Sequence, residues 1–247
     1  MNIFLLGLVL IFSVYSKDIV VFIHPSTVFN ISGERFFPAI QNIDLPGWHK
    51  ITKKSLIKNC YNEVFLPFVN NYFLYFDNIK SDFYMFNWSG SIYPIKKKHI
   101  ASRQLCQAIL DYLVDHPDDE LILIGCSHGG SVILGMADLL KKHNIRVSKV
   151  ILLGTPISDK NNENALEKLS DGSYVFSKII NIYSESDYIQ KIDFIFNNYK
   201  FCQRILNTRE GVINYKIGNI GHINLWHKIF SKKPFLIEIP RIIKLLK

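Results

Sequence analysis

The chain has 247 residues, of which 48% are hydrophobic and 13% aromatic, a composition that excludes a disordered chain because it supplies enough apolar surface for a core. This length is typical of one α/β domain. The formal net charge is +8, but no motif for binding RNA or DNA accompanies it, so we predict no nucleic-acid partner. We interpret the excess charge as a solvated basic face, with attraction to an anionic membrane or substrate as the alternative.

An apolar leader opens the chain. Residues 3–14 carry no charge, and Val14 and Ser16 then place small side chains at the −3 and −1 positions of a signal-peptidase site. The apolar run is shorter than the roughly 20 residues that a membrane span requires. We therefore expect residues 1–16 to be a signal peptide and residues 17–247 to form one domain of a secreted, periplasmic or envelope protein. An uncleaved membrane anchor or a buried first strand is the alternative.

Six apolar runs predict the strands of one sheet, and amphipathic segments between them predict helices. The strands are expected at residues 18–23, 83–88, 121–124, 147–153, 178–183 and 212–217. Helices are expected at residues 95–114, 129–140 and 235–246, and residues 56–69 are expected to be helical in part. Pro46-Gly47 indicates a turn, and the segment after Pro156 resembles a polar loop. This alternation predicts an α/β fold, with a mostly parallel central sheet and helices on both faces.

The segment from Gly125 to Gly129 has the pattern G-x-S-x-G between a predicted strand and a predicted helix. In this context the pattern is a nucleophile elbow, whose sharp turn forces Ser127 into strained backbone geometry with its hydroxyl above the sheet edge. Glycines two positions on either side avoid collisions with the neighbouring strand and helix. The N–H of His128, at the positive end of the helix, points to where an oxyanion would form. A chance match in a glycine-containing turn is the alternative.

A serine needs a base to take its proton, and the base needs a carboxylate to orient it. Reacting groups gather where parallel strands end. Asp187 follows the predicted strand at 178–183, and His222 follows the last predicted strand in a loop with Gly218 and Gly221. The order Ser127, Asp187, His222 is the one expected for such an elbow. Glu185 and Asp159 are the alternatives for the acid, and His227 is the alternative for the base.

The cysteines show neither C-x-x-C pairing nor the spacing of a zinc site, and no metal or other cofactor is predicted. Cys126 adjoins Ser127, but its side chain is expected to point into the sheet as part of the core. One disulfide would fit an oxidising compartment, and the sequence does not choose its partners among Cys60, Cys106, Cys126 and Cys202.

Together these motifs resemble the α/β-hydrolase superfamily, and in particular its lipase- and esterase-like serine hydrolases. The resemblance rests on the elbow, on the strand-terminal Gly154-Thr155-Pro156, on Asp187 and on Gly221-His222. Residues 86–90 also resemble a segment of uncharacterised bacterial hydrolases of this fold. The resemblance implies a catalytic triad of Ser127, His222 and Asp187 and a carboxylic ester as substrate, small-molecule and lipid esters included.

The same resemblance implies a second oxyanion donor and a substrate pocket. The second N–H maps to Ser26, which follows His24-Pro25 where the family has a His-Gly pair. Proline has no N–H, so the donor is Ser26 itself. His24 and Trp88 are expected to line the pocket, with ordinary core packing as the alternative for Trp88. An acyltransferase or thioesterase with the same triad, or a hydrolase-fold binding protein without turnover, is the alternative function.

Overall fold

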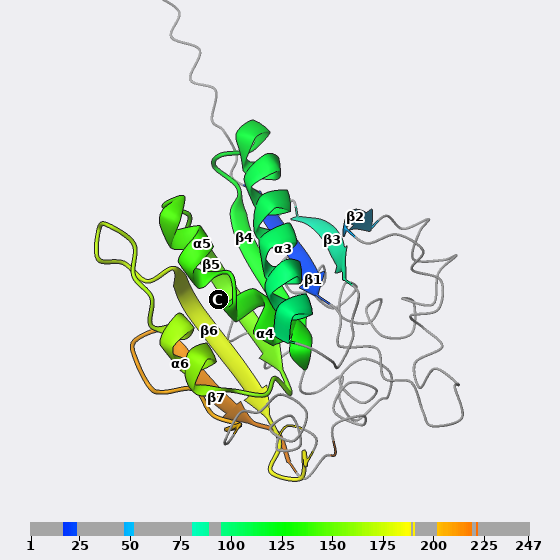
Figure 1. Ribbon diagram of the computed structural model, residues 1–247, viewed down its shortest axis with the longest axis vertical. Coiled ribbons are helices and arrows are strands. Elements are labelled where there is room, and N and C mark those ends of the chain that lie inside the picture. The colour runs from blue at the N-terminus through cyan, green and yellow to red at the C-terminus, as the bar shows by residue number, and fades with distance from the viewer. Residues whose placement is uncertain are drawn as a thin grey trace, which may run out of the picture.

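One sheet organises the molecule, which we describe from a computed structural model (Figure 1). The structure describes residues 17–23, 47–51, 81–88, 95–188, 190, 202–218 and 221. Within these residues the strands are β1 Asp18–Ile23, β2 Gly47–Ile51, β3 Ser81–Asn87, β4 Glu120–Cys126, β5 Val147–Leu153, β6 Phe176–Tyr183 and β7 Val212–Lys216. The helices are α3 Ile95–Asp115, α4 His128–Leu134, α5 Ala137–Lys142 and α6 Asp159–Ala165. All six predicted strands are therefore present, as is the helix predicted at 95–114.

The strand order across the sheet is β2-β3-β1-β4-β5-β6-β7. β2 pairs antiparallel with β3, and every other pair is parallel. The carboxyl ends of β4, β5, β6 and β7 therefore lie in sequence along one edge of the sheet. This mostly parallel seven-stranded sheet with helices confirms the predicted fold class.

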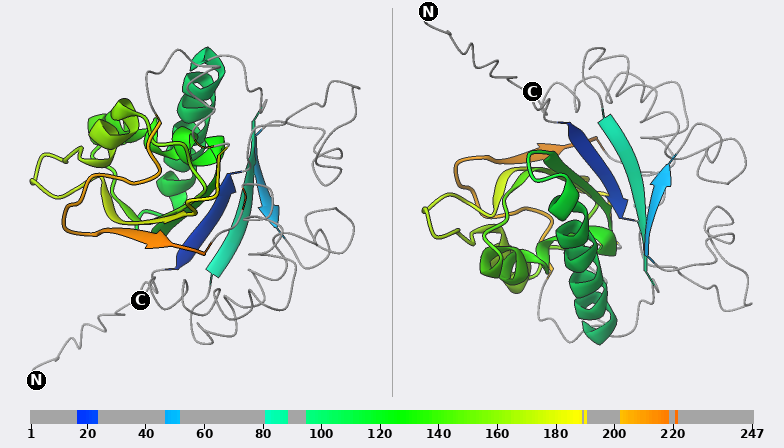
Figure 2. Two further views of the ribbon diagram at one scale, coloured as in Figure 1. Left: turned by 90° about the horizontal axis from the view of Figure 1, so that it is seen from below. Right: turned by 90° about the horizontal axis from the view of Figure 1, so that it is seen from above.

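The central strands are buried on both faces, which explains why they could be recognised as unbroken apolar runs. In β1, Ile19, Val21 and Ile23 belong to the core cluster that also contains residues of α3 and α4, and the alternate residues Val20 and Phe22 are equally inaccessible. Figure 2 shows α3, α4, α5 and α6 together on one face of the sheet. The helices predicted at 56–69 and 235–246 lie outside the described residues.

The helix predicted at 129–140 is two helices, α4 and α5, separated at Gly135 and Met136. The chain tightens there, because the Met136 N–H donates to the carbonyl of Ile133, three residues back. Gly135 also lies against α3, where a Cβ would be 2.6 Å from the Ser102 hydroxyl oxygen. The apolar spacing runs through this break, so periodicity alone predicted one helix.

α6 occupies a segment that was predicted to be a polar loop. Ser158 caps it by accepting a hydrogen bond from the Asn161 N–H at 3.1 Å. Asparagine disfavours helix interiors, but these amides have tertiary partners: Asn161 Nδ2 donates to the Pro156 carbonyl, and Asn162 Oδ1 accepts from the Asn207 N–H. The polar composition therefore reflects buried hydrogen bonds.

β2 was not predicted, and Pro46-Gly47 was interpreted as a turn before it. Gly47 has a positive φ of 123° but belongs to the strand itself. β2 is half-buried and pairs only with β3 in the described sheet, so it lacks the apolar run that marks the inner strands. Among the described residues, no helix is both long enough and apolar enough to cross a membrane.

Candidate active site

Ser127 occupies a strained turn between β4 and α4. Its φ is 48° and its ψ is −123°, and Asn144 is the only other non-glycine residue with a positive φ in the described part of the chain. Such a conformation costs a residue with a Cβ about 1–3 kcal/mol and persists only where the surroundings impose it. The elbow geometry predicted from the G-x-S-x-G pattern is therefore present at Ser127.

Hydrogen bonds from two elements hold this turn. The Ser127 N–H donates to the carbonyl of Leu153 at the end of β5, at 2.8 Å. The Ser127 carbonyl accepts from the Gly130 N–H in α4, at 3.0 Å. The strained residue is thus fixed by the neighbouring strand as well as by its own helix.

Two glycines let β4, α4 and the loop after β5 come together below the serine. A Cβ at Gly125 would lie 2.6 Å from the Cα of Gly130, which agrees with the predicted role of Gly125. A Cβ at Gly130 would lie only 2.0 Å from the Thr155 Oγ1. Thr155 is fully buried, so its side chain fills the space that a larger residue at 130 would need.

Main-chain hydrogen bonds continue the sheet across the ends of four strands. Beyond the bond from Ser127 to Leu153, the Gly154 N–H donates to the Ile182 carbonyl, and the Ile217 N–H donates to the Tyr183 carbonyl. The segments that leave β4, β5, β6 and β7 therefore start side by side. Since neighbouring strands are about 4.8 Å apart, Ser127 and the segment after β6 are separated by about 10 Å at this edge.

Asp187 lies in the segment after β6 and is completely buried. Its Oδ1 accepts from the Gln190 N–H at 3.2 Å, and its carbonyl accepts from the Arg204 guanidinium at 3.2 Å and 3.0 Å. Gln190 Nε2 also donates to the Thr155 carbonyl at 2.9 Å. Gln190 thereby connects the segment that carries Asp187 to the loop that packs against the elbow.

The alternative acids lie in different surroundings. Glu185 is exposed, and its carboxylate is 2.7 Å from the Lys216 ammonium, whose hydrogen bond lowers the pKa of Glu185. Asp159 is exposed as the first residue of α6. Of these three carboxylates, Asp187 alone is buried at the edge where Ser127 lies.

The predicted base and one predicted oxyanion donor are not among the described residues. His222, its alternative His227, Ser26 and His24 all lie outside them. The loop that leads to His222 begins next to the segment of Asp187, because the Ser184 hydroxyl donates to the Gly218 carbonyl at 2.8 Å.

His128 is buried and is the first residue of α4, so its main-chain N–H belongs to the first turn of that helix.

Cys126 is buried beneath the elbow, and burial raises the pKa of its thiol to about 12, which keeps it protonated. Cys106 and Cys126 form no disulfide, and Cys60 lies outside the described residues. Trp88 is 5% exposed and belongs to the core cluster, as the core-packing alternative expects.

Some residues that position the site were not found from the sequence: Gln190, Arg204 and the contact of Thr155 with Gly130. The Gly154-Thr155-Pro156 motif marked the position of Thr155 but not its partner. No local pattern marks the other two residues, because each is a single polar side chain in an irregular segment. Within the described ranges, no three His, Cys, Asp or Glu side chains gather in a way that could hold a metal ion.

The comparisons with known proteins identify a family and a fold. The model of the family described as "Protein of unknown function (DUF726)" matches residues 94–247, whereas none of the curated proteins matches the chain. Among solved structures, an arylesterase is 10% identical with a TM-score of 0.52, the alignment covering 93% of this chain and 76% of that one. An uncharacterized protein from Bacillus cereus is 13% identical with a TM-score of 0.50, over 94% and 60% of the two chains.

A serine hydrolase without a lid from Xanthomonas campestris is 12% identical with a TM-score of 0.46, over 92% of this chain and 78% of that one. The likeness to the arylesterase, at 10% identity, shows the fold alone, and it agrees with the α/β-hydrolase fold predicted from the motifs. Because the family model matches more than half of the sequence, the chain belongs to the DUF726 family of proteins of unknown function.

Proposed function

We propose that this protein is a serine hydrolase that cleaves a carboxylic ester through an acyl-enzyme. The observation that carries the proposal is the strained backbone of Ser127 in a strand-to-helix turn. The buried Asp187 and the loop that leads to His222 leave neighbouring strands at the same edge. This is the arrangement in which a serine nucleophile, an acid and a base converge in α/β-hydrolases.

The reaction proceeds in two steps. Ser127 Oγ attacks the ester carbonyl while the imidazole of His222 takes its proton, and the N–H groups of His128 and Ser26 stabilise the oxyanion. The ester C–O bond then breaks, and His222 returns the proton to the leaving alcohol. Water attacks the acyl group on Ser127 in the same way, which releases the acid and restores the enzyme. Asp187 orients His222 and stabilises its charged form.

Replacement of Ser127 tests the proposal. Ser127→Ala is expected to fold normally and to lower kcat for a hydrolysable ester by about 10⁴–10⁶-fold. A series of p-nitrophenyl esters of graded chain length measures the rate and identifies the preferred acyl group. The control is Ser170→Ala, which replaces an exposed serine outside the elbow and should leave the rate unchanged.

A fluorophosphonate probe checks the nucleophile independently of substrate choice, because it phosphonylates an activated serine oxygen and displaces fluoride. The wild-type chain should be labelled at Ser127, and His222→Ala and Asp187→Asn should be labelled much more slowly. Unlabelled wild-type protein without esterase activity would contradict the proposal and favour a binding protein of the same fold. Acyl transfer to an acceptor other than water would appear in the product analysis.

We also propose that residues 1–16 are removed on export and that residues 17–247 form the mature hydrolase domain. The main-chain nitrogen of Lys17 lies 3.0 Å from Asp119 Oδ1. Cleavage after Ser16 would turn this nitrogen into a charged α-amino group beside that carboxylate, which strengthens the contact. Mass spectrometry of the exported protein should give Lys17 as the first residue, and a chain that still begins at Met1 would contradict it.

A further inference from the structure

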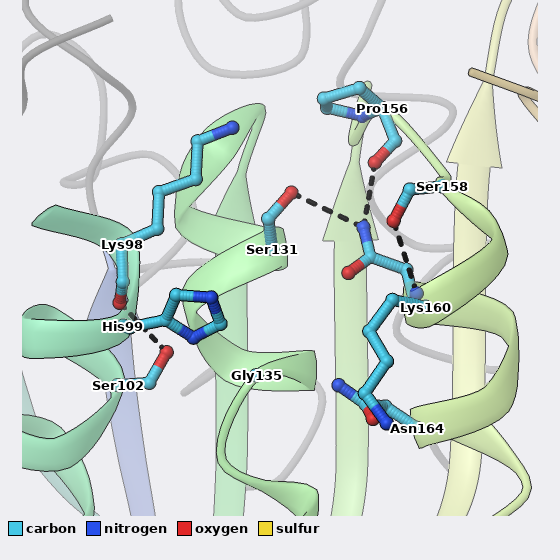
Figure 3. A pocket seen from close by; sticks show the side chains of 10 residues that line it. Lys98, His99, Ser102, Ser131, Gly135, Pro156, Ser158, Lys160 and Asn164 are labelled. Carbon is cyan, nitrogen blue, oxygen red and sulfur yellow. Dashed lines mark hydrogen bonds between the residues drawn. The ribbon is translucent and has the colours of Figure 1, made fainter. Parts of the chain in front are cut away.

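A second site lies away from the elbow, in a groove over the outer side of α4 (Figure 3). Its floor is made by small residues, Ser131 and Gly135, and its walls are α3 on one side and α6 with the preceding loop on the other. The cavity measures about 50 Å³, room for about four water-sized groups. This space can hold a single phosphate group.

The rim of this groove is basic. Lys98 and His99 from α3 and Lys160 from α6 line it, and no carboxylate of the described residues does. Lys160 Nζ is 3.4 Å from Glu163 and 4.0 Å from Asp138, but all three side chains are more than half exposed, so these pairs are weak and solvent competes for them. Lys98 is the last of three consecutive lysines at 96–98, and this end of the run lies at the cavity.

Three buried polar side chains inside the groove can each make a further hydrogen bond. The Ser131 hydroxyl accepts from Asn161 Nδ2, and the Ser158 hydroxyl accepts from the Asn161 N–H. Neither hydroxyl hydrogen donates to an acceptor among the described residues. Asn164 is 4% exposed, and its Oδ1 has no partner in the described part of the chain. Rotation of that amide by 180° would place its NH₂ group where the Oδ1 atom now lies.

From these observations we infer that the groove binds the phosphate group of a free or esterified phosphate. Hydroxyl donors stand on α4 and on the loop before α6, cationic groups stand on both walls, and together they approach from three elements. That arrangement suits a tetrahedral oxyanion better than a planar carboxylate. The site is distinct from the proposed ester-cleaving centre, but its floor residue Ser131 in α4 is only one helical turn beyond Ser127, which precedes that helix.

The direct test is calorimetric titration of the full-length protein with inorganic phosphate, with ionic strength held constant by potassium chloride. We expect saturable binding of one phosphate, and weaker binding of acetate. Lys160→Gln and Ser131→Ala should each weaken phosphate binding by about tenfold, because each removes a charge-assisted hydrogen bond. Lys142→Gln, an exposed lysine of α5 outside the groove, is the matched control and should bind phosphate as the wild type does.

Two results would overturn the inference: no saturable phosphate binding, or equal affinity in the wild type and in Lys160→Gln. Because Lys160 is 51% exposed, its replacement keeps the test valid even if Ser131→Ala does not fold. Comparison of glycerol 3-phosphate with phosphatidylcholine vesicles that contain phosphatidic acid then shows whether the phosphate is soluble or membrane-borne. These measurements need no ester hydrolysis, so the phosphate site and the proposed function can fail separately.

Discussion

At the scale of single residues, the turn at Ser127 depends on the close approach of two small residues that are distant in sequence. Gly130 follows the serine in α4, and Thr155 reaches it from the loop after β5. The same loop is hydrogen-bonded to Gln190 beside Asp187. The packing at Gly130 therefore affects both the position of the nucleophile and the position of the proposed acid.

Gly130→Ala should destabilise the protein by about 1–3 kcal/mol, because the new Cβ would meet Thr155 Oγ1 at 2.0 Å in a closed space. Urea denaturation measures the change in the free energy of unfolding. Thr155→Ala in the same chain should restore part of the loss, which a double-mutant cycle would show. Gly218→Ala is the control, since no atom of the described residues lies within 4 Å of its Cβ position, and an equal loss in the two glycine variants would contradict the argument.

At the scale of elements, one arginine fastens the segment before β7 to the rest of the domain. The guanidinium of Arg209 donates to the carbonyls of Ala165, Phe176 and Glu210. It also lies over the ring of Tyr174, 3.7 Å from the ring centre. These contacts join the end of α6 and the start of β6 to the segment that leads into β7, after which the chain continues toward His222.

Arg209→Met should lower the free energy of unfolding by about 2 kcal/mol, because it removes three hydrogen bonds and a cation–π contact. Arg209→Lys should lie between the wild type and Arg209→Met, since an ammonium keeps the charge but lacks the planar fork. Thermal and urea unfolding measure both. Arg146→Met, at an exposed arginine, is expected within about 0.5 kcal/mol of the wild type; a similar value for Arg209→Met would show that the contacts contribute nothing.

The elements that were predicted are those whose signals are local. β1 and β4 have apolar residues on both faces, so their sequences read as continuous runs, and most residues of β5 and β6 are apolar as well. β2 has no such run because it is half-buried at the edge of the described sheet. α6 was missed because its asparagines are stabilised by partners as distant as Asn207, 45 residues away.

The candidate site likewise has one part that the sequence predicted and another part that depends on distant contacts. The elbow at Ser127 was predictable because its pattern and its flanking elements are contiguous in sequence. Arg204 donates a hydrogen bond to the Asp187 carbonyl, 17 residues away, and Gln190 donates one to the Thr155 carbonyl, 35 residues away. Such contacts form only when the chain folds, and no spacing of residues in the sequence predicts them.

At the scale of the whole molecule, the two ends of the sheet have different chemistry. The carboxyl ends of β4 to β7 carry the proposed catalytic groups. At the opposite end of β3, Asp82 Oδ2 lies 2.5 Å from the Lys17 ammonium and 2.8 Å from the Lys50 ammonium. This cluster connects β2, β3 and the residue that precedes β1, so its charge state bears on stability and not on the reacting atoms.

Asp82 should make stability depend on pH in acid. Burial alone would raise the pKa of Asp82, but hydrogen bonds from Lys17 and Lys50 outweigh burial and lower it. A lowered pKa in the folded state stabilises the protein above the ordinary aspartate pKa of about 3.9, and this contribution is lost as the pH falls through the lowered value. Asp82→Asn should therefore cost about 1 kcal/mol at pH 7.

The difference between wild type and Asp82→Asn should shrink as the pH falls below about 4, as urea denaturation across that range would show. The rate of ester hydrolysis per folded molecule should be the same in both proteins at pH 7. A difference in stability that stays constant between neutral and acid pH would contradict the proposed role of this carboxylate.

The hydrogen bond from the Ser127 N–H to Leu153 has a consequence for how the protein is made. A nascent chain that has left the ribosome only as far as the end of α5 already contains the whole glycine–serine motif. It still lacks β5, and with it the acceptor that holds the turn in its unusual conformation. The strained turn is therefore held in place only after translation has delivered the next strand, and under the proposed function the unfinished polypeptide would not yet have the geometry that ester attack requires.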